Sequence, residues 1–90
     1  MKTVLVIGAQ GVLGGLTAEI FRAQGWNVLR GGRRVETAPD FRLVDLDHME
    51  TFAAARCGVD LVVSAVEDPD CRAERHVLEN GGAILTMASS

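Results

Sequence analysis

Three glycines near the N-terminus have the spacing of a turn that can hold a phosphate group. Gly8, Gly11 and Gly14 follow a run of branched apolar residues, 4–7, that is typical of a buried parallel strand. Gly8 allows a sharp turn, Gly11 leaves no Cβ between the backbone and a pyrophosphate, and Gly14 lets the next helix lie close to its strand. The free N–H groups and positive end of that helix would face the ligand. The pattern therefore predicts a strand–turn–helix unit that binds a dinucleotide.

Arginines gather after the next apolar stretch. Residues 26–30 are typical of a second strand, and Arg30, Arg33 and Arg34 lie at its end or just beyond it. Sites that prefer NAD usually place Asp or Glu there to accept hydrogen bonds from the ribose, whereas the first acidic residue here is Glu36. Guanidinium groups bind a 2′-phosphate through charge-assisted contacts. We therefore expect NADP to be favoured over NAD; the alternative is that each arginine is simply solvated in a polar loop.

Length and composition limit the remaining possibilities. Ninety residues, 48% hydrophobic and 23% charged, suit one globular domain, 1–90. The net charge of −3 gives no reason to expect nucleic acid or an anionic membrane as a partner. The apolar runs are too short to cross a bilayer, so a cytoplasmic protein is the expectation. The spacing of Cys57, Cys71, His48 and His76 matches no metal motif.

The chain alternates between strand-like and helix-like segments. After the glycine turn, the apolar residues Leu13, Leu16, Ile20 and Phe21 recur at helical spacing and predict the buried face of a helix that ends at Gly25. Further strands are expected at 41–46, 59–66 and 83–88, and further helices at about 48–56 and 71–79. A short connection, 31–40, joins the second and third strands.

Local signals also predict how two helices begin and how the arginine loop behaves. Asp47 and Glu50 have the spacing of a capping box, and Asp70 is placed to cap the helix that follows it. The pair Gly31-Gly32 predicts a flexible start to the arginine loop.

Five strands alternating with helices predict a doubly wound parallel α/β sheet in the order 3-2-1-4-5. Ligands of such sheets bind beyond the carboxyl ends of the strands, where the strand order reverses. This architecture would gather the glycine turn, the arginines, Asp45-Leu46 and Ser64-Ala65-Val66 along one groove.

With these motifs, the chain resembles the NAD(P)-binding N-terminal domain of saccharopine dehydrogenase-like proteins, a Rossmann-like domain, with the short-chain dehydrogenase/reductase families close in pattern. The resemblance covers essentially all of the chain. It implies that the turn surrounds the pyrophosphate, that Asp45 and Leu46 lie against adenine, and that Ala65 and Val66 pass near the nicotinamide ribose. The alternative is that Asp45 only ends a strand and that Ala65 and Val66 are core residues. The turn residues concerned are Gly8, Ala9, Gln10, Gly11, Val12, Leu13 and Gly14.

The chain also departs from these families. It contains no tyrosine, so the Y-x-x-x-K proton transfer of short-chain reductases is absent, and no residue presents itself as a nucleophile or proton shuttle. In the saccharopine-type proteins a second domain follows the fifth strand. We therefore expect a fragment truncated after that strand, acting as the NADP(H)-binding domain of an oxidoreductase whose substrate and catalytic residues lie elsewhere.

Two other readings of the sequence stay open. One is a nucleotide-sensing or interaction module without turnover, with the edge strand 83–88 as a surface for a homo-oligomer. The other is the same fold with an empty cofactor site.

Overall fold

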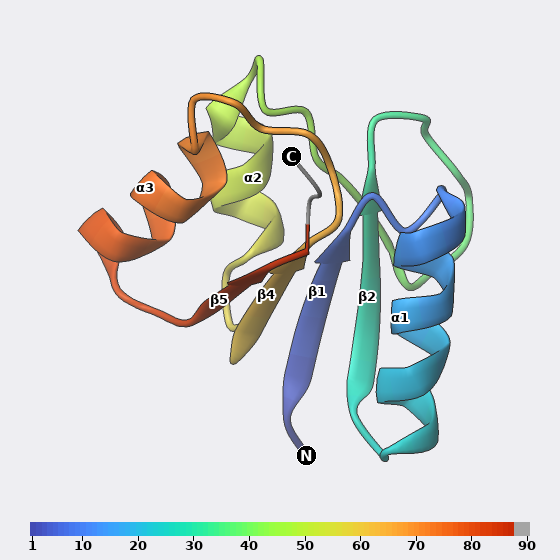
Figure 1. Cartoon of the computed structure of the whole chain (residues 1–90). Coiled ribbons are helices and arrows are strands. Elements are labelled where there is room, and N and C mark those ends of the chain that lie inside the picture. The colour runs from blue at the N-terminus through green and yellow to red at the C-terminus, as the bar shows by residue number, and fades with distance from the viewer. Residues whose placement is uncertain (88–90) are drawn as a thin grey trace.

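The chain forms one parallel sheet of five strands with helices on both faces (Figure 1). The computed structural model describes residues 1–87. Within this range the strand order is β3-β2-β1-β4-β5, as the sequence predicts. No helix in this range is long and apolar enough to cross a membrane. The elements are β1 (Thr3–Ile7), α1 (Val12–Ala23), β2 (Asn27–Gly32), β3 (Phe41–Leu43), α2 (Met49–Ala55), β4 (Leu61–Ser64), α3 (Arg72–Asn80) and β5 (Ile84–Thr86).

The central strand β1 organises both faces of the sheet. It pairs in parallel with β2 on one side and with β4 on the other. Leu5 and Ile7 belong to the core under α2 and α3, whereas Val4 and Val6 belong to the core under α1. All four side chains are buried, which explains why this strand is an unbroken apolar run.

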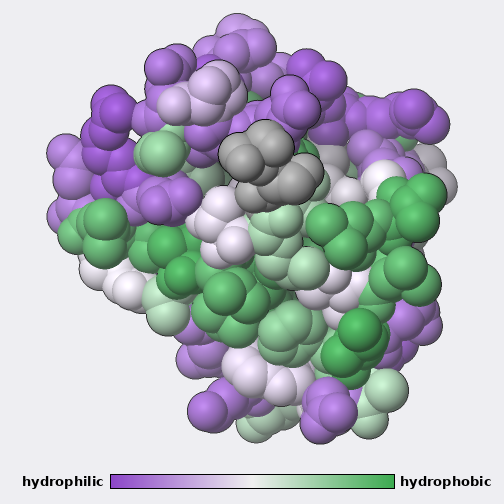
Figure 2. All heavy atoms as spheres, in the orientation of Figure 1, coloured by the Kyte–Doolittle hydropathy of each residue, from purple (hydrophilic) through white to green (hydrophobic). Residues whose placement is uncertain are grey.

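Helix α1 packs on the sheet through its small residues, so the predicted buried face is wrong. Gly14, Thr17 and Ala18 are buried, while Leu16 and Ile20 are 60% and 62% exposed. The physical reason is the closeness of the helix to its strand, which leaves room only for small side chains at the contact. Figure 2 shows apolar surface on the side of the molecule where α1 lies. Of the predicted apolar set, Phe21 is half-buried and packs edge-on against Trp26.

The strands also differ from the predicted bounds. Gly31 and Gly32 are the last residues of β2, paired with β1 or β3 and buried, so they are not a flexible loop start. The side chains of Val44 and Leu5 pack directly against Gly31. The predicted strands 41–46 and 59–66 are real but shorter, spanning Phe41–Leu43 and Leu61–Ser64. The last predicted strand is Ile84–Thr86, and residue 88 lies outside the described residues.

Two predicted helix caps are also wrong. The residue before α2 is His48, with no side-chain cap, because the Asp47 carboxylate binds Arg72 instead. The residue before α3 is Cys71, in a left-handed conformation, and the carboxylate that accepts a first-turn N–H group is that of Asp68 rather than Asp70. The predicted stop at Gly25 is confirmed, since Gly25 adopts positive φ after α1, and Gly81 does the same after α3.

Two adjacent glycines of α1 test the close packing of this helix. A Cβ on Gly14 would collide with the backbone of Gly8 and Ala9, whereas a Cβ on Gly15 would meet only Ala9 O at 3.5 Å. We expect Gly14→Ala to lower the free energy of unfolding by about 2 kcal/mol or more. Gly15→Ala should raise it by about 0.5–1 kcal/mol, because alanine is the better helix former. Urea unfolding of both variants measures the difference; equal effects would contradict the packing described.

Candidate functional site: a cleft at the carboxyl ends of the strands

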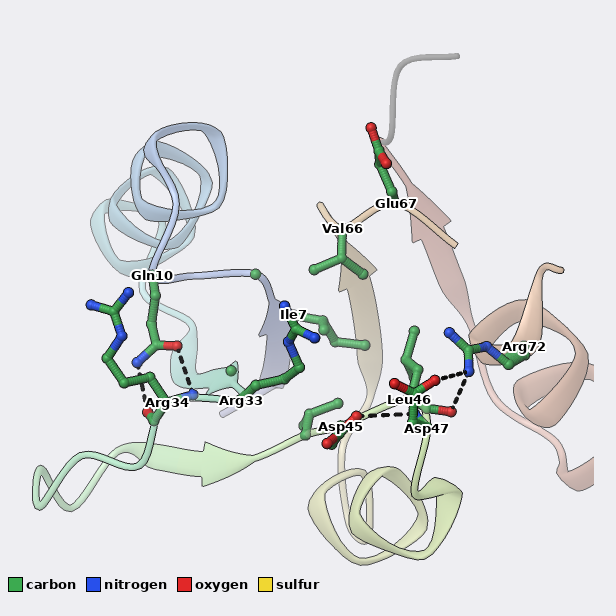
Figure 3. A pocket seen from close by; sticks show the side chains of 13 residues that line it. Ile7, Gln10, Arg33, Arg34, Asp45, Leu46, Asp47, Val66, Glu67 and Arg72 are labelled. Carbon is green, nitrogen blue, oxygen red and sulfur yellow. Dashed lines mark hydrogen bonds and ion pairs between the residues drawn. The ribbon is translucent and has the colours of Figure 1, made fainter. Parts of the chain in front are cut away.

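A cleft of about 890 Å³ opens at the carboxyl ends of the strands. The segments after β1, β2, β3 and β4 all line it, which is the convergence that the sequence predicts. Figure 3 shows the side chains around this opening. The lining residues are Ile7, Gly8, Gln10, Gly32, Arg33, Arg34, Val44, Asp45, Leu46, Asp47, Val66, Glu67 and Arg72.

The glycine turn has an open backbone. Gly8 adopts φ +84°, and a Cβ there would lie 2.7 Å from Val66 Cγ1, so only glycine fits. The N–H groups of Gly8 and Ala9 donate to Gly31 O at 2.9 and 3.3 Å, which fixes the turn to the end of β2. Gly11 is exposed, and a Cβ there would approach only Gly8 O, at 3.4 Å. A charged group could therefore reach the backbone at Gly11 without meeting a side chain.

No side chain in the first turn of α1 neutralises the partial positive charge of the helix N-terminus. Its first turn carries no acidic residue, and its side chains Val12 and Leu13 are exposed rather than folded over the turn. The partial positive charge of a helix N-terminus favours anions. Of the predicted turn residues, only Gly8 and Gln10 line the cleft; Ala9, Gly11, Val12, Leu13 and Gly14 do not.

The arginines divide into two groups. Arg33 and Arg34 are exposed, line the cleft and form no ion pair within residues 1–87. In Figure 3 the Arg33 guanidinium lies near Ile7 in the middle of the cleft, and that of Arg34 lies beside Gln10. These two guanidinium groups are available to an anion.

Arg30, by contrast, is not brought to the cleft, although the sequence groups it with Arg33 and Arg34. Its guanidinium binds Glu36 Oε1 at 2.6 Å and Asp40 Oδ2 at 3.0 Å. The hydrogen bond from Arg30 holds the pKa of the Asp40 carboxyl below its ordinary value. Its positive charge is thus already matched by two carboxylates.

The opposite wall holds Asp45, Leu46 and Asp47, fixed by Arg72 of α3. Arg72 Nη1 donates to Leu46 O and to Asp47 Oδ1, both at 2.8 Å. The hydrogen bond from Arg72, followed by the charges of Arg72 and Arg33, lowers the pKa of the Asp47 carboxyl. Asp45 Oδ1 accepts from the backbone N–H of Asp47 at 3.0 Å, so one Asp45 oxygen orders its own turn. Sequence reasoning missed Arg72, whose partner lies 25 positions earlier and carried no local signal.

The segment after β4 closes the remaining side. Val66 lines the cleft, whereas Ala65 does not and is held by its N–H donating to Ile7 O at 3.0 Å. Glu67 places an exposed carboxylate at this end. No Ser, Thr, Cys, Tyr, Lys or His lines the cleft within the part of the chain that the structure describes. The arrangement provides charge and an open backbone for an elongated anion.

Two solved structures share this fold. One is a short-chain dehydrogenase/reductase superfamily protein from Agrobacterium tumefaciens with bound NAD, at TM-score 0.61 and 25% identity, covering 80% of this chain and 24% of that one. The other is the nucleoside-diphosphate sugar epimerase from Corynebacterium glutamicum, also at TM-score 0.61 and 25% identity, covering 84% of this chain and 16% of that one. The fold is thus the Rossmann-like α/β fold of short-chain dehydrogenase/reductase proteins.

The chain spans about a quarter or less of the length of these neighbours. No protein-family model matches the chain, and no curated protein matches it. The resemblance to saccharopine dehydrogenase-like proteins is not confirmed by these comparisons.

The anchoring of the wall after β4 can be tested at Asp68. Burial alone would raise the pKa of the Asp68 carboxyl, but hydrogen bonds from the N–H groups of Ala73 and Arg72 and from the Arg72 side chain lower it. Asp68→Ala removes the cap of α3 and one partner of Arg72, so the free energy of unfolding should fall by about 1–2 kcal/mol at pH 7. Asp70→Ala, the matched control at an exposed position, should change it by less than about 0.5 kcal/mol.

Thermal or urea unfolding at pH 7 and at pH 3 measures this effect. A carboxyl whose pKa is lowered by folding stabilises the fold above its unfolded pKa and loses that effect as the pH falls through its folded pKa. The difference between wild type and Asp68→Ala should therefore shrink on acidification. A larger loss for Asp70→Ala would show that the cap is misassigned.

Proposed function

We propose that this chain is the NADP(H)-binding domain of an oxidoreductase. The observation that carries the proposal is the pair Arg33 and Arg34, which line the cleft beyond β2 and form no ion pair within residues 1–87. The short-chain dehydrogenase/reductase neighbour solved with bound NAD supports a nicotinamide dinucleotide as the ligand. The arginines then favour the form that carries a 2′-phosphate.

The cleft and the helix start beside it would hold such a molecule at four places. The exposed backbone of Gly11 and the positive end of α1, next to the cleft-lining Gly8 and Gln10, would hold the pyrophosphate. Arg33 and Arg34 would hold the adenosine 2′-phosphate, with Asp45 and Leu46 against the adenine and the free acceptor capacity of Asp45 available to its amino group. The nicotinamide ribose would lie towards Val66. When bound, the dinucleotide supplies hydride chemistry, and this chain orients it.

The proposed preference for NADP depends on the type of side chain that follows β2. An NAD site needs a carboxylate there that can accept from the ribose hydroxyls. The nearest acidic residue, Glu36, does not line the cleft and is turned towards Gln10 and Arg30. The negative charge of Glu36 is therefore matched by Arg30 instead of facing a 2′-phosphate.

The catalytic residues and the substrate would come from outside these 90 residues. Within the described range, none of the cleft-lining residues is a histidine, tyrosine, lysine or cysteine, and the carboxylates of Asp45 and Asp47 hold contacts within the chain. The matched part of this chain covers only 24% and 16% of the two neighbours. A saccharopine dehydrogenase-like parent is the specific form of this proposal, based on the sequence resemblance.

Removing both free arginines tests the cofactor preference. Arg33→Ala/Arg34→Ala should weaken NADPH binding at least about tenfold, because each lost hydrogen bond to a charged group is worth about 1.5–3 kcal/mol. NADH affinity should change by less than about twofold. Isothermal titration calorimetry with NADPH and with NADH gives the ratio of the two affinities.

The control is Arg42→Ala/Arg75→Ala, which removes the same charge from residues outside this cleft. It should leave the NADPH to NADH ratio near the wild-type value. A wild-type chain that binds both dinucleotides equally, or an arginine variant that keeps the preference, would refute the assignment.

A further inference from the structure

The side chain of Gln10 joins the glycine turn to the arginine segment. Its Nε2 donates to Arg34 O at 2.7 Å and to Glu36 Oε2 at 2.8 Å, and its Oε1 accepts from Arg34 N at 3.2 Å. Figure 3 shows the amide lying between the two segments. Both ends of the amide therefore bond to the backbone of one residue, in the manner of two paired strands.

These bonds leave the amide little to offer a ligand. A glutamine side chain has two N–H donors, and both are used here within the chain. Although Gln10 lines the cleft, its side chain acts on its neighbours rather than on whatever occupies the cleft.

The sequence makes room for this contact at Gly32. A Cβ on Gly32 would collide with the Gln10 amide, and its three nearest atoms are all in the Gln10 side chain. Gly32 does not have positive φ. Glycine is therefore needed here for space rather than for backbone conformation, and the space is filled by Gln10.

Glu36 is held on its other side as well. Its Oε1 binds Arg30 at 2.6 Å, and Arg30 also binds Asp40. The hydrogen bonds from Gln10 and then Arg30 lower the pKa of the Glu36 carboxyl, so it stays an anion and an acceptor at neutral pH. The network thus fixes both ends of the loop that carries Arg33 and Arg34.

We propose that Gln10 is the positioning residue that sets where Arg34 meets the adenosine 2′-phosphate. Its amide clamps the Arg34 backbone against the glycine turn, so the guanidinium stands next to the open backbone that would hold the pyrophosphate. This inference rests on the proposed function, since it concerns selectivity between phosphorylated and unphosphorylated adenosine. Without the clamp, the arginine loop is free to move, and binding of the ligand has to order it at a cost in conformational entropy.

Two different substitutions break the same clamp. Gln10→Ala removes the amide, and Gly32→Ala displaces it while leaving Gln10 in the sequence. Gln24→Ala is the matched control, because Gln24 is exposed at the other end of α1. The first readout needs no ligand: hydrogen exchange of the Arg34 backbone amide should become at least about tenfold faster in both clamp variants and stay unchanged in the control. Unchanged exchange in Gln10→Ala would overturn the clamp.

The second readout is the ratio of the affinities for 2′,5′-ADP and ADP. This ratio isolates the contribution of the 2′-phosphate to binding. Each clamp variant should lower this ratio about fivefold to tenfold while the affinity for ADP itself stays within about twofold. The double variant should lose no more than either single variant, because both act on one contact. If Gln10 and Gly32 served folding alone, the substitutions would lower the affinities for 2′,5′-ADP and ADP by the same factor.

The outcomes separate this inference from the proposed function. A wild-type chain that binds neither nucleotide overturns the proposed function, and the selectivity role of Gln10 falls with it. A wild-type chain that prefers 2′,5′-ADP, with the same ratio in Gln10→Ala and Gly32→Ala, overturns only the role of Gln10. Faster amide exchange together with an unchanged ratio leads to the same conclusion.

Discussion

The close contact between the start of α1 and the end of β1 is the constraint on which the rest of the structure depends. Gly14 lies against the backbone of Gly8, and the small residues Thr17 and Ala18 continue the contact along the helix. This contact aims the positive end of α1 at the carboxyl ends of the strands. Because Gly8 and Ala9 also bond to Gly31, the same turn fixes the end of β2, from which the arginines follow.

The charges around the cleft are arranged so that two arginines remain free. Arg30 and Arg72 are each bound by two carboxylates and serve to hold the walls, Arg30 behind the arginine loop and Arg72 across the segment after β3. Arg33 and Arg34 have no such partner in the described range. An anion entering the cleft would therefore meet unpaired guanidinium groups without first breaking an ion pair, which lowers the cost of binding.

The sequence was sufficient to predict the elements whose signals are local or repeated along the chain. The apolar run of β1, the glycine spacing, the helix stop at Gly25 and the alternation of strands with helices predicted the five-stranded order and the place of the cleft. The predictions that failed depend on contacts between distant residues. The apolar stripe with Leu16 and Ile20 looked like a core face, but the closeness of α1 admits only small side chains. Asp47 matched a capping box, yet Arg72 binds it from α3. For the same reason the contacts of Gln10 with Arg34 and Glu36, 24 and 26 positions away, carried no signal in the sequence.

The central claim is that the cleft binds a dinucleotide by both its pyrophosphate and its adenosine 2′-phosphate. Phosphorus NMR of NADPH with and without the protein observes these groups separately. If the account is correct, the pyrophosphate and 2′-phosphate signals both shift on binding. The 2′-phosphate, whose second pKa is about 6 when free, should also lose its proton at lower pH beside Arg33 and Arg34. A 2′-phosphate signal that titrates as in free NADPH, in a sample where the pyrophosphate signals shift, would contradict the account.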